Sequence, residues 1–336
     1  MREVPVGTAI RVRTPASSAN LGPGFDSIGL ALGVWDELDV EVVEEPGLRI
    51  EVSGSGADGV PRDESHLVYR SLARGLRDLG IAVPGGLVMH TINAVPHGRG
   101  MGSSATAIVS GVAAAQGLSV AAELVAAGRR GSGVDALAID LEAVNSLASE
   151  LEGHPDNASA TVFGGMTLSW SVEDDLPAGP DPAPAGDAEP GSRHTVTVGL
   201  PLHPDLTAVV FVPETTLATH TARALLPERV PLRDAARNSA RAALLVEAAT
   251  RRPELLVPAT RDWLHQEARR PSYAASMALV DRLRAQGHAA MISGAGPSVL
   301  VLTTVGRVNQ VQSGADDQWR RLVPGIPASG VQVVLR

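Results

Sequence analysis

The 336-residue chain contains no cysteine and no lysine. Without cysteine it has no disulfide, no thiol nucleophile and no cysteine-type metal site. Without lysine it can use neither Schiff-base chemistry nor the lysine with which P-loop enzymes and protein kinases contact ATP phosphates. The 28 side chains counted as lysine plus arginine are therefore all arginines. Any cationic site residue must be an arginine or a charged histidine, and arginine suits bidentate binding of carboxylate or phosphate.

The chain also lacks the marks of a membrane or secreted protein. No apolar run reaches the roughly 20 residues that span a bilayer, and the N-terminus has no apolar segment typical of a signal peptide. We therefore expect a cytoplasmic protein with no membrane contact. A net charge of −9 argues against nucleic acid as the main partner, because nucleic-acid binding depends on basic surface.

The most informative stretch is the glycine-rich segment 95–106. Gly98, Gly100 and Gly102 alternate with other residues, and Ser103 and Ser104 then open a run of small side chains that we expect to be helical to about residue 116. Glycine permits positive φ and the close approach of a ligand, and a helix start presents unpaired N–H groups. The segment predicts a cradle for nucleotide phosphates; the alternative is a plain glycine-rich turn before a buried helix. It is not a P-loop, which needs Gly-Lys-Ser/Thr.

Two polar residues, Asn20 and Asp26, lie in a segment rich in glycine, proline and serine. We expect this segment to be a loop over residues 15–26, after a strand over 8–14. The two residues are either turn caps or ligand contacts, and turn chemistry favours capping.

The rest of the chain alternates strands and helices, which predicts an α+β fold, and its length predicts two domains. We expect a pair of strands over 38–43 and 48–52, a strand over 87–92 that leads into the glycine-rich segment, and helices over residues 67–79, 134–151, 232–249, 255–264, 274–286 and 308–322. Residues 171–193 contain five prolines and no periodicity. The predicted division is an N-terminal ATP-binding domain 1–170, a linker or surface loop 171–194, and a C-terminal domain 195–336.

Three signatures follow one another along nearly the whole chain. Residues 18–26 read Ser-Ala-Asn-Leu-Gly-Pro-Gly-Phe-Asp, residues 96–104 hold the three glycines and two serines, and residues 293–298 read Ser-Gly-Ala-Gly-Pro-Ser. Between the last two lies Glu-Gly-His-Pro-Asp-Asn at 152–157. In this order they resemble the homoserine kinases, a family within the galacto-, homoserine, mevalonate and phosphomevalonate kinase (GHMP) superfamily. The first signature distinguishes homoserine kinases from their sister families.

The resemblance implies an N-terminal domain like ribosomal protein S5 domain 2 and a ferredoxin-like C-terminal domain. ATP would lie over the phosphate loop and the substrate in the cleft between the domains, and the chain would form a homodimer. The implied reaction is ATP-dependent phosphorylation of the side-chain hydroxyl of L-homoserine, which yields O-phospho-L-homoserine for threonine biosynthesis.

The resemblance also implies which residues bind nucleotide and metal. ATP contacts are expected from Pro96, His97, Gly98, Arg99, Gly100, Met101, Gly102, Ser103, Ser104, Ala105 and Thr106, with His66 beside the adenine. Ser104 would offer a hydroxyl and Glu152 a carboxylate to Mg²⁺, which prefers hard oxygen ligands; Glu150 is the competing carboxylate. His66 replaces the asparagine usual in the family, and His97 and Met101 are less usual in the phosphate loop.

For the substrate, the resemblance implies that Arg223 and Arg269 hold the carboxylate by forked hydrogen bonds. Arg270 is the alternative to Arg269, and Asp26 would bind the ammonium. The other substrate contacts are expected from Asn20, His154, Asn157, Thr219 and Gly294.

The expected catalytic residues are Ser104, Glu152, Asn157 and Arg223. Since the chain has no lysine and homoserine kinases lack an obvious general base, phosphoryl transfer would rest on positioning and electrostatics. A general base at His154 is the alternative.

Two other functions stay open. The chain could be a superfamily kinase for another small alcohol, such as mevalonate or a related amino alcohol, or a catalytically silent nucleotide or metabolite sensor with the same fold. The paired arginines and Asp26 favour an amino acid, because mevalonate has no ammonium group. The presence of Ser104, a candidate metal carboxylate and both clamp arginines argues against the sensor.

Overall fold

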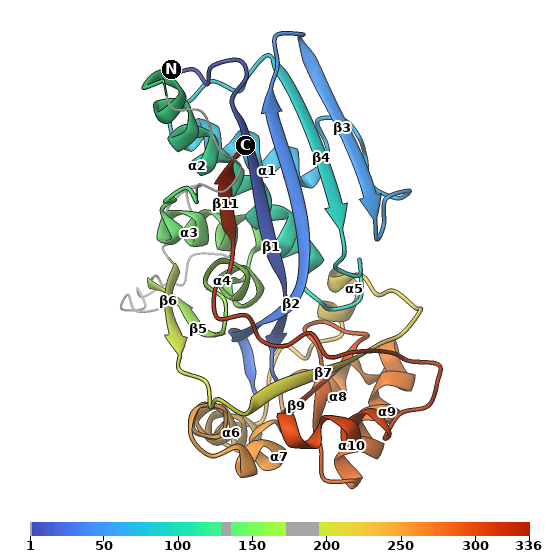
Figure 1. Cartoon of the computed structure of the whole chain (residues 1–336). Helices are drawn as coiled ribbons and strands as arrows, with labels where there is room; N and C mark the ends of the chain where they lie inside the picture. The colour runs from blue at the N-terminus through green and yellow to red at the C-terminus, as the bar shows by residue number, and fades with distance from the viewer. Residues whose placement is uncertain (1, 129–135, 173–194) are drawn as a thin grey trace.

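The computed structural model describes residues 2–128, 136–172 and 195–336. In these residues two sheets carry helices packed against them (Figure 1). The first sheet contains β1 (Ala9–Asn20), β2 (Gly24–Val42), β3 (Gly47–Gly54), β4 (Gly86–Asn93), β5 (Met166–Ser171), β6 (Thr195–Leu200) and β11 (Gln332–Leu335). Its order is β11-β1-β2-β4-β3, with β5 paired to β2 and β6 paired to β5.

Four helices cover one face of the first sheet: α1 (Leu67–Asp78), α2 (Ser103–Ala126), α3 (Leu141–Glu152) and α4 (Pro155–Phe163). Along β1, Ile10 and Val12 are buried beneath these helices. Arg11 alternates with them and pairs with Asp39 of β2 at 2.7 Å. This period-two alternation confirms the predicted strand.

The second sheet has the order β10-β7-β9-β8. Its strands are β7 (Leu206–Val212), β8 (Ala289–Ile292), β9 (Val299–Thr304) and β10 (Arg320–Leu322). The helices of this half are α5 (Thr219–Arg223), α6 (Leu232–Thr250), α7 (Leu256–Ala259), α8 (Gln266–Arg269), α9 (Ala274–Ala285) and α10 (Val308–Gln312), with short 3₁₀ segments at Pro253–Leu255, Arg270–Tyr273 and Val305–Arg307.

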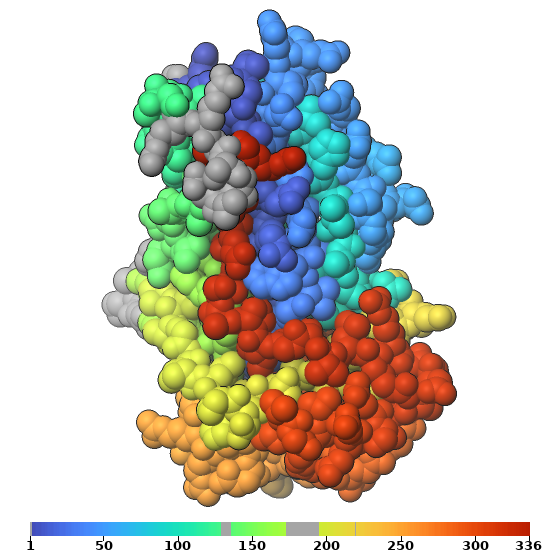
Figure 2. Space-filling view, viewed as in Figure 1, coloured from blue at the N-terminus to red at the C-terminus, as the bar shows by residue number. Residues whose placement is uncertain are grey.

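One buried cluster joins the two sheets. It contains Leu21 from the β1–β2 turn, Met101 from the glycine-rich segment, and Val210 and Leu300 from the second sheet, all fully buried. The end of the chain returns to the first sheet, where β11 pairs with β1. In Figure 2 this last segment is the red band that runs up the face of the molecule. The two halves are therefore packed around a shared core.

The expected division at residues 171–194 does not coincide with a change of sheet. β5 ends at Ser171, β6 begins at Thr195, and these two strands pair with each other. Residues 173–194 lie outside the described part of the chain. We keep the two domains as a proposal, with the first sheet receiving strands from both.

The expected loop over residues 15–26 is wrong in its first part, since β1 continues to Asn20. Pro15 lies at a register shift between β1 and β2, where a missing N–H removes no regular ladder bond. The serines that suggested a loop are buried, and the hydroxyl of Ser18 lies 2.8 Å from that of Ser293. Only the short turn between β1 and β2 is a loop.

The two strands expected over 38–43 and 48–52 are present, but they are not neighbours, because β4 lies between β2 and β3. The connection bonds to the start of β4 instead: Val43 N donates to Gly86 O at 3.1 Å, and Gly47 N donates to Gly85 O at 2.8 Å. These two bonds leave β3 on the far side of β4, to which it runs parallel.

Several helices end at other residues than expected. α2 continues past residue 116, because Gly117 lets the helix pack closely on β11; a Cβ there would lie 2.6 Å from Val333 Cγ1. The helix expected over 134–151 begins at Leu141, capped by Asp140, and residues 129–135 lie outside the described part. The helix expected over 255–264 ends at Ala259, and that expected over 308–322 ends at Gln312, before β10.

The prediction that no apolar run could span a bilayer needs correction for α2. By length and composition alone, this 24-residue helix is long and apolar enough to cross a bilayer. It is the one helix in the described ranges of which this is true. Of its most apolar window, 61% is buried inside the protein, where Ile108 and Leu118 pack under the first sheet. Its apolar character matches its place in the core.

Candidate active site

The glycine-rich segment forms a tight loop between β4 and the start of α2 at Ser103, as predicted. Gly98, Gly100 and Gly102 have φ of 62°, 72° and 71°. A Cβ on Gly100 would lie 2.2 Å from the carbonyl oxygen of Ser293. Glycine is therefore required at this point by the approach of the protein's own backbone as well as by the turn.

The 293–298 segment braces this loop. The hydroxyl of Ser293 donates to Gly100 O at 2.6 Å. One residue further on, Gly294 N donates to Ala19 O at 3.3 Å, and the Asn20 amide donates back to Gly294 O at 3.2 Å. The three sequence signatures that are far apart in the chain thus meet at the phosphate loop.

A small cavity of ≈ 70 Å³ lies on one side of the loop, beside the start of α2. It is lined by most of the residues expected to bind substrate or metal: Asn20, Asp26, Ser104, Glu152, His154, Asn157, Arg223, Arg269 and Gly294. The side chain of the other expected substrate residue, Thr219, is outside those that the structure describes. We call this hollow the substrate cavity.

A larger cavity of ≈ 310 Å³ lies on the other side of the loop and shares Gly98, Ser103 and Ser104 with the substrate cavity. We call it the base cavity, since its apolar lining, which includes Leu38 and Pro61, suits a flat heterocycle. His66 and His97 also line it. His66 is buried, its Nδ1 has no hydrogen-bond partner among the described residues, and burial lowers the pKa of its imidazole.

Not every expected ATP residue points a side chain at these cavities. The guanidinium of Arg99 instead donates to the carbonyl oxygens of Pro213 and Glu214, at 3.0 and 2.8 Å. Pro96 lies with Arg99 in a separate hollow behind the loop. The side chains of Met101, Ala105 and Thr106 are in fully buried positions. These residues can contact phosphate only through their backbone.

The expected metal ligands meet at the substrate cavity. Ser104 Oγ donates to Glu152 Oε2 at 2.8 Å. Burial raises the pKa of the Glu152 carboxyl, although the Ser104 hydrogen bond and the charge of His154 oppose the shift. Glu150 lies elsewhere, where its carboxylate accepts from Arg74 at 3.1 Å. A hydroxyl and a carboxylate are hard oxygen donors that fit Mg²⁺.

These donors do not form a metal cage on their own. In the described ranges no group of three or more His, Cys, Asp or Glu side chains could hold a metal ion. Mg²⁺ bound here would need phosphate oxygens and water to complete six ligands, which is the usual arrangement in kinases.

The expected substrate charges lie side by side. Arg223 donates to Asp26 at 2.7 Å, and the two side chains are 44% and 33% exposed. Arg269 is only 2% exposed. It donates to Ala222 O at 3.1 Å, but no carboxylate of the described residues lies within ion-pair distance of it. Arg270, the alternative, pairs at the surface with Glu267 and Asp281 and does not line the cavity.

Asn20 serves as a cap, which is the interpretation that turn chemistry favours. Its Oδ1 accepts from Asp26 N at 3.0 Å while its amide nitrogen donates to Gly294 O. Both polar atoms are therefore engaged with the protein. They stabilise Asp26 in a left-handed conformation, with φ of 53°, that a non-glycine residue rarely adopts.

His154 and Asn157 follow Glu152 at the start of α4. His154 Nδ1 lies 3.0 Å from Asp156 Oδ1, and Asn157 Oδ1 accepts from Ser17 at 3.1 Å. Burial alone would lower the pKa of His154, but its contact with Asp156 and the charges of Glu152 and Asp26 raise it. A raised pKa disfavours the neutral imidazole that a general base needs.

The sequence interpretation missed two residues. Asp36 is 8% exposed and accepts from Ala94 N and Val95 N, at 2.7 and 2.8 Å, where β4 runs into the phosphate loop. Burial raises its pKa to about 6. A signal was present, since Asp36 occupies an inward position in the alternation of Leu38, Val40 and Val42.

Phe25 is the second missed residue. Its ring centre lies 5.8 Å from the Arg223 guanidinium carbon and 5.6 Å from that of Arg269. An aromatic face at this distance attracts both cations and orders them without neutralising either. The guanidinium groups stay able to bind an anion.

Comparisons with known proteins show the family of the chain. Residues 66–165 match the family of GHMP kinase N-terminal domains. The chain is 45% identical over 326 residues to a homoserine kinase of Streptomyces coelicolor, covering 97% of this chain and 94% of that protein. It is 45% identical over 302 residues to a homoserine kinase of Rhodococcus opacus, covering 90% of this chain and 89% of that protein.

Solved structures share the fold. A homoserine kinase from Cytophaga hutchinsonii matches with a TM-score of 0.75 at 24% identity, covering 97% of this chain and 98% of that chain. A mevalonate diphosphate decarboxylase from Staphylococcus aureus matches with a TM-score of 0.59 at 15% identity, over the same shares. These likenesses confirm the predicted α+β GHMP kinase fold. By its fold, and by its sequence over nearly the whole length, the chain belongs to the homoserine kinase family of the GHMP superfamily.

Proposed function

We propose that this chain transfers the γ-phosphoryl group of ATP to the side-chain hydroxyl of L-homoserine and so makes O-phospho-L-homoserine for threonine biosynthesis. The observation that carries the proposal is the buried Arg269, which has no carboxylate partner in the described residues, beside the Asp26–Arg223 pair. An unpaired buried cation is costly. A ligand carboxylate at this point would remove that cost.

The substrate of this proposal is a zwitterion that matches the three charges. Its carboxylate would bind Arg223 and Arg269, and its ammonium would bind Asp26. The ligand carboxylate would take the place of Asp26 beside Arg223, and the ligand ammonium would take the place of Arg223 beside Asp26. This exchange leaves no charge unpaired. Asn157 and His154 would then border the hydroxyl end of the molecule.

ATP would lie across the phosphate loop, with its base in the base cavity near His66. Its phosphate oxygens would accept hydrogen bonds from the backbone N–H groups at the start of α2. Ser104 and Glu152 would hold Mg²⁺, which when bound neutralises charge on the phosphate oxygens. In the transfer the homoserine oxygen bonds to the γ-phosphorus while the bond from that phosphorus to the oxygen bridging to the β-phosphate breaks. The hydroxyl proton passes to an oxygen of the transferred phosphoryl group, and ADP leaves.

We infer that no side chain needs to act as a strong base. Phosphoryl transfer depends mainly on alignment and on stabilising charge, and Arg223 would neutralise charge on the moving group.

The test is ADP release from Mg-ATP with L-homoserine, L-threonine, L-serine or mevalonate. We expect efficient turnover with L-homoserine alone. Arg223→Ala and Arg269→Ala should raise its KM roughly 10- to 100-fold, since a charged hydrogen bond contributes about 1.5–3 kcal/mol. Arg270→Ala, the matched control, should not raise it.

Each other result has a definite meaning. Turnover with mevalonate would keep the kinase and reject the zwitterion site. ATP binding without turnover of any alcohol would favour the silent sensor. An Arg270→Ala effect equal to that of Arg269→Ala would reject Arg269 as the clamp.

The metal site has its own test. Glu152→Gln should raise the Mg²⁺ concentration for half-maximal activity by at least about tenfold, because the variant loses an anionic ligand. Glu150→Gln is the control, since Glu150 pairs with Arg74 away from the cavity. Equal Mg²⁺ requirements in the two variants would contradict the assignment.

We also propose that the chain works in the cytoplasm as a homodimer, as the resemblance implies. Light scattering should then give twice the 34.7 kDa chain mass, and the mass of a single chain would reject the dimer.

A further inference from the structure

We propose that His265 is a positioning residue for the substrate carboxylate, because its imidazole orients the guanidinium of Arg269. The proposal rests on the proposed function, in which Arg269 binds that carboxylate. His265 itself is absent from the lining of the substrate cavity, so it would act through Arg269 alone.

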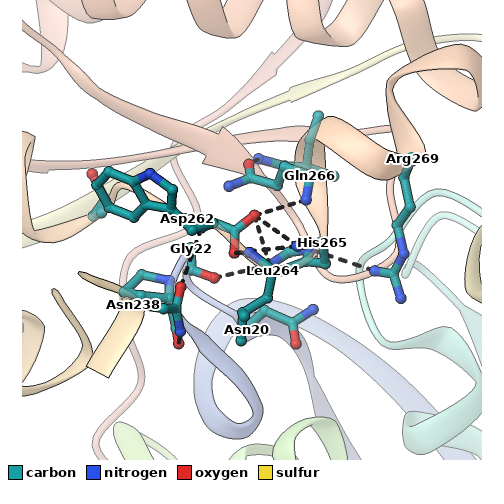
Figure 3. A network of polar contacts seen from close by, with 12 residues as sticks. Asn20, Gly22, Asn238, Asp262, Leu264, His265, Gln266 and Arg269 are labelled. Atoms are coloured by element: carbon teal, nitrogen blue, oxygen red, sulfur yellow. Dashed lines mark hydrogen bonds and ion pairs between the residues drawn. The ribbon is translucent and has the colours of Figure 1, made fainter. Parts of the chain in front are cut away.

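The turn that carries His265 is fixed by Asp262. The Asp262 carboxylate, 1% exposed, accepts backbone N–H groups from Leu264 at 2.8 Å, His265 at 3.1 Å and Gln266 at 2.7 Å. Figure 3 shows these bonds as dashed lines that converge on Asp262. His265 is the residue before α8, and Arg269 ends that helix. One short, capped helix therefore sets the spacing between the two side chains.

The partners of the imidazole select one tautomer. His265 Nε2 lies 2.8 Å from Gly22 O, and a carbonyl oxygen only accepts, so Nε2 carries the proton. Nδ1 lies 3.5 Å from Arg269 Nη1, and a guanidinium only donates, so Nδ1 must offer its lone pair. The neutral imidazole protonated at Nε2 satisfies both contacts, and its Nε2 also lies 3.7 Å from the buried Asp262 carboxylate. Burial, which lowers the pKa of His265, agrees with this state.

The same ring links Arg269 to the turn that leads into β2, the strand that carries Asp26. Gly22 belongs to the turn between β1 and β2, and the turn has little room to shift, since a Cβ on Gly22 would lie 2.5 Å from Thr260 O. The Phe25 ring lies 5.1 Å from the His265 ring, tilted by 32°. His265 thus connects Arg269, at the end of α8, with the turn that precedes Asp26. These are the two sides of the site that would bind the substrate carboxylate and ammonium.

Two substitutions separate the two hydrogen bonds of the ring. In His265→Asn the shorter amide lies near the place of Nδ1 and can still accept from Arg269. In His265→Gln the longer amide lies near the place of Nε2 and can still donate to Gly22 O. For the Asn variant we expect a KM for L-homoserine within about threefold of wild type. For the Gln variant we expect a rise of about tenfold, the size of one hydrogen bond.

The other kinetic constants distinguish positioning from general damage. In both variants kcat and the KM for ATP should stay within about twofold of wild type. A merely structural role would make the KM for L-homoserine follow the loss in Tm, whichever bond is kept. Equal KM values in the two variants, or a fall in kcat at unchanged KM, would overturn the proposal.

A double-mutant cycle with Arg269→Ala adds a second readout. If His265 acts through Arg269, His265→Gln should not raise the KM further once Arg269 is absent. An additive rise would overturn the proposal.

Nitrogen NMR of histidine-labelled wild-type chain needs no variant that might fail to fold. It should show His265 protonated at Nε2 and bare at Nδ1, and the opposite tautomer would overturn the proposal. A wild-type chain that does not phosphorylate L-homoserine would reject the proposed function instead, and the tautomer would still be measurable.

Discussion

At the scale of single residues, the two arginines proposed to bind the substrate carboxylate differ in solvent exposure. Arg223 is partly exposed and already paired with Asp26, whereas Arg269 is buried and held by a carbonyl oxygen, an imidazole and an aromatic ring. The exposed pair can open at little cost, because such pairs contribute about 0–1 kcal/mol. The buried arginine keeps its place without a counter-charge. The site is therefore ordered before substrate arrives.

Asp26→Asn tests the ammonium contact. We expect the Tm to change little, because the pair with Arg223 is partly exposed, while the KM for L-homoserine rises at least about tenfold. With 4-hydroxybutyrate, which lacks the ammonium, wild type and variant should differ by no more than about threefold. Equal losses for the two alcohols would show that Asp26 does not recognise the ammonium.

Asp36 gives a pH prediction. Its pKa is raised from 3.8 to about 6, so between these pH values the folded chain binds more protons than the unfolded chain. The stability contributed by Asp36 therefore falls as pH rises through this window, by up to about 3 kcal/mol. Asp36→Asn keeps an oxygen that can accept from both Ala94 and Val95 and has no charge to bury.

The measurement is the free energy of unfolding in urea at pH 4.5 and 6.5. Other groups titrate in both chains, so the quantity of interest is the difference between wild type and Asp36→Asn. The free energy of unfolding of Asp36→Asn minus that of wild type should be larger at pH 6.5 than at pH 4.5. If the free energies of unfolding of the two chains changed in parallel with pH, burial would not raise the pKa of Asp36.

At the scale of elements, the phosphate loop is held by parts of the chain that are distant in sequence. Ser293 contacts Gly100, and Arg99 anchors the residues that lead from β7 toward α5 and Arg223. The loop also borders both the base cavity and the substrate cavity.

A matched pair of glycine substitutions tests this bracing. Gly100→Ala and Gly98→Ala both place alanine at positive φ, which costs about 1–2 kcal/mol. A Cβ on Gly100 would also lie 2.2 Å from Ser293 O, whereas the nearest atom to one on Gly98 is 3.4 Å away. We expect Gly100→Ala to lose roughly 1–3 kcal/mol more in urea unfolding than Gly98→Ala. Equal losses would argue against close packing at Gly100.

The sequence predicted elements whose cause is local. The start of α2 follows from glycines and serines beside one another, and α1 follows from its periodicity and from Gly80 after its end. The pairing of β3 with β4 and the extension of β1 past Pro15 depend on contacts between distant segments, which no local pattern records. The direction of Arg99 and the role of His265 depend on such contacts too. The other candidate site residues were predicted from the signatures, which carry a family's geometry.

At the scale of the whole molecule, the site lies where the two sheets share a core. Met101 of the phosphate loop is buried in the cluster that joins β1, β2 and the second sheet. The loop is therefore part of the structure that joins the two halves, and Arg223 and Arg269 reach the substrate cavity from the second half. Binding of ATP and of the amino acid should stabilise both halves together.

The most direct test of the account is to identify the product formed from Mg-ATP and L-homoserine by phosphorus NMR and mass spectrometry. We predict one ADP for each molecule of homoserine that gains a phosphate monoester on its side-chain oxygen. ADP together with inorganic phosphate and unmodified homoserine would contradict the account.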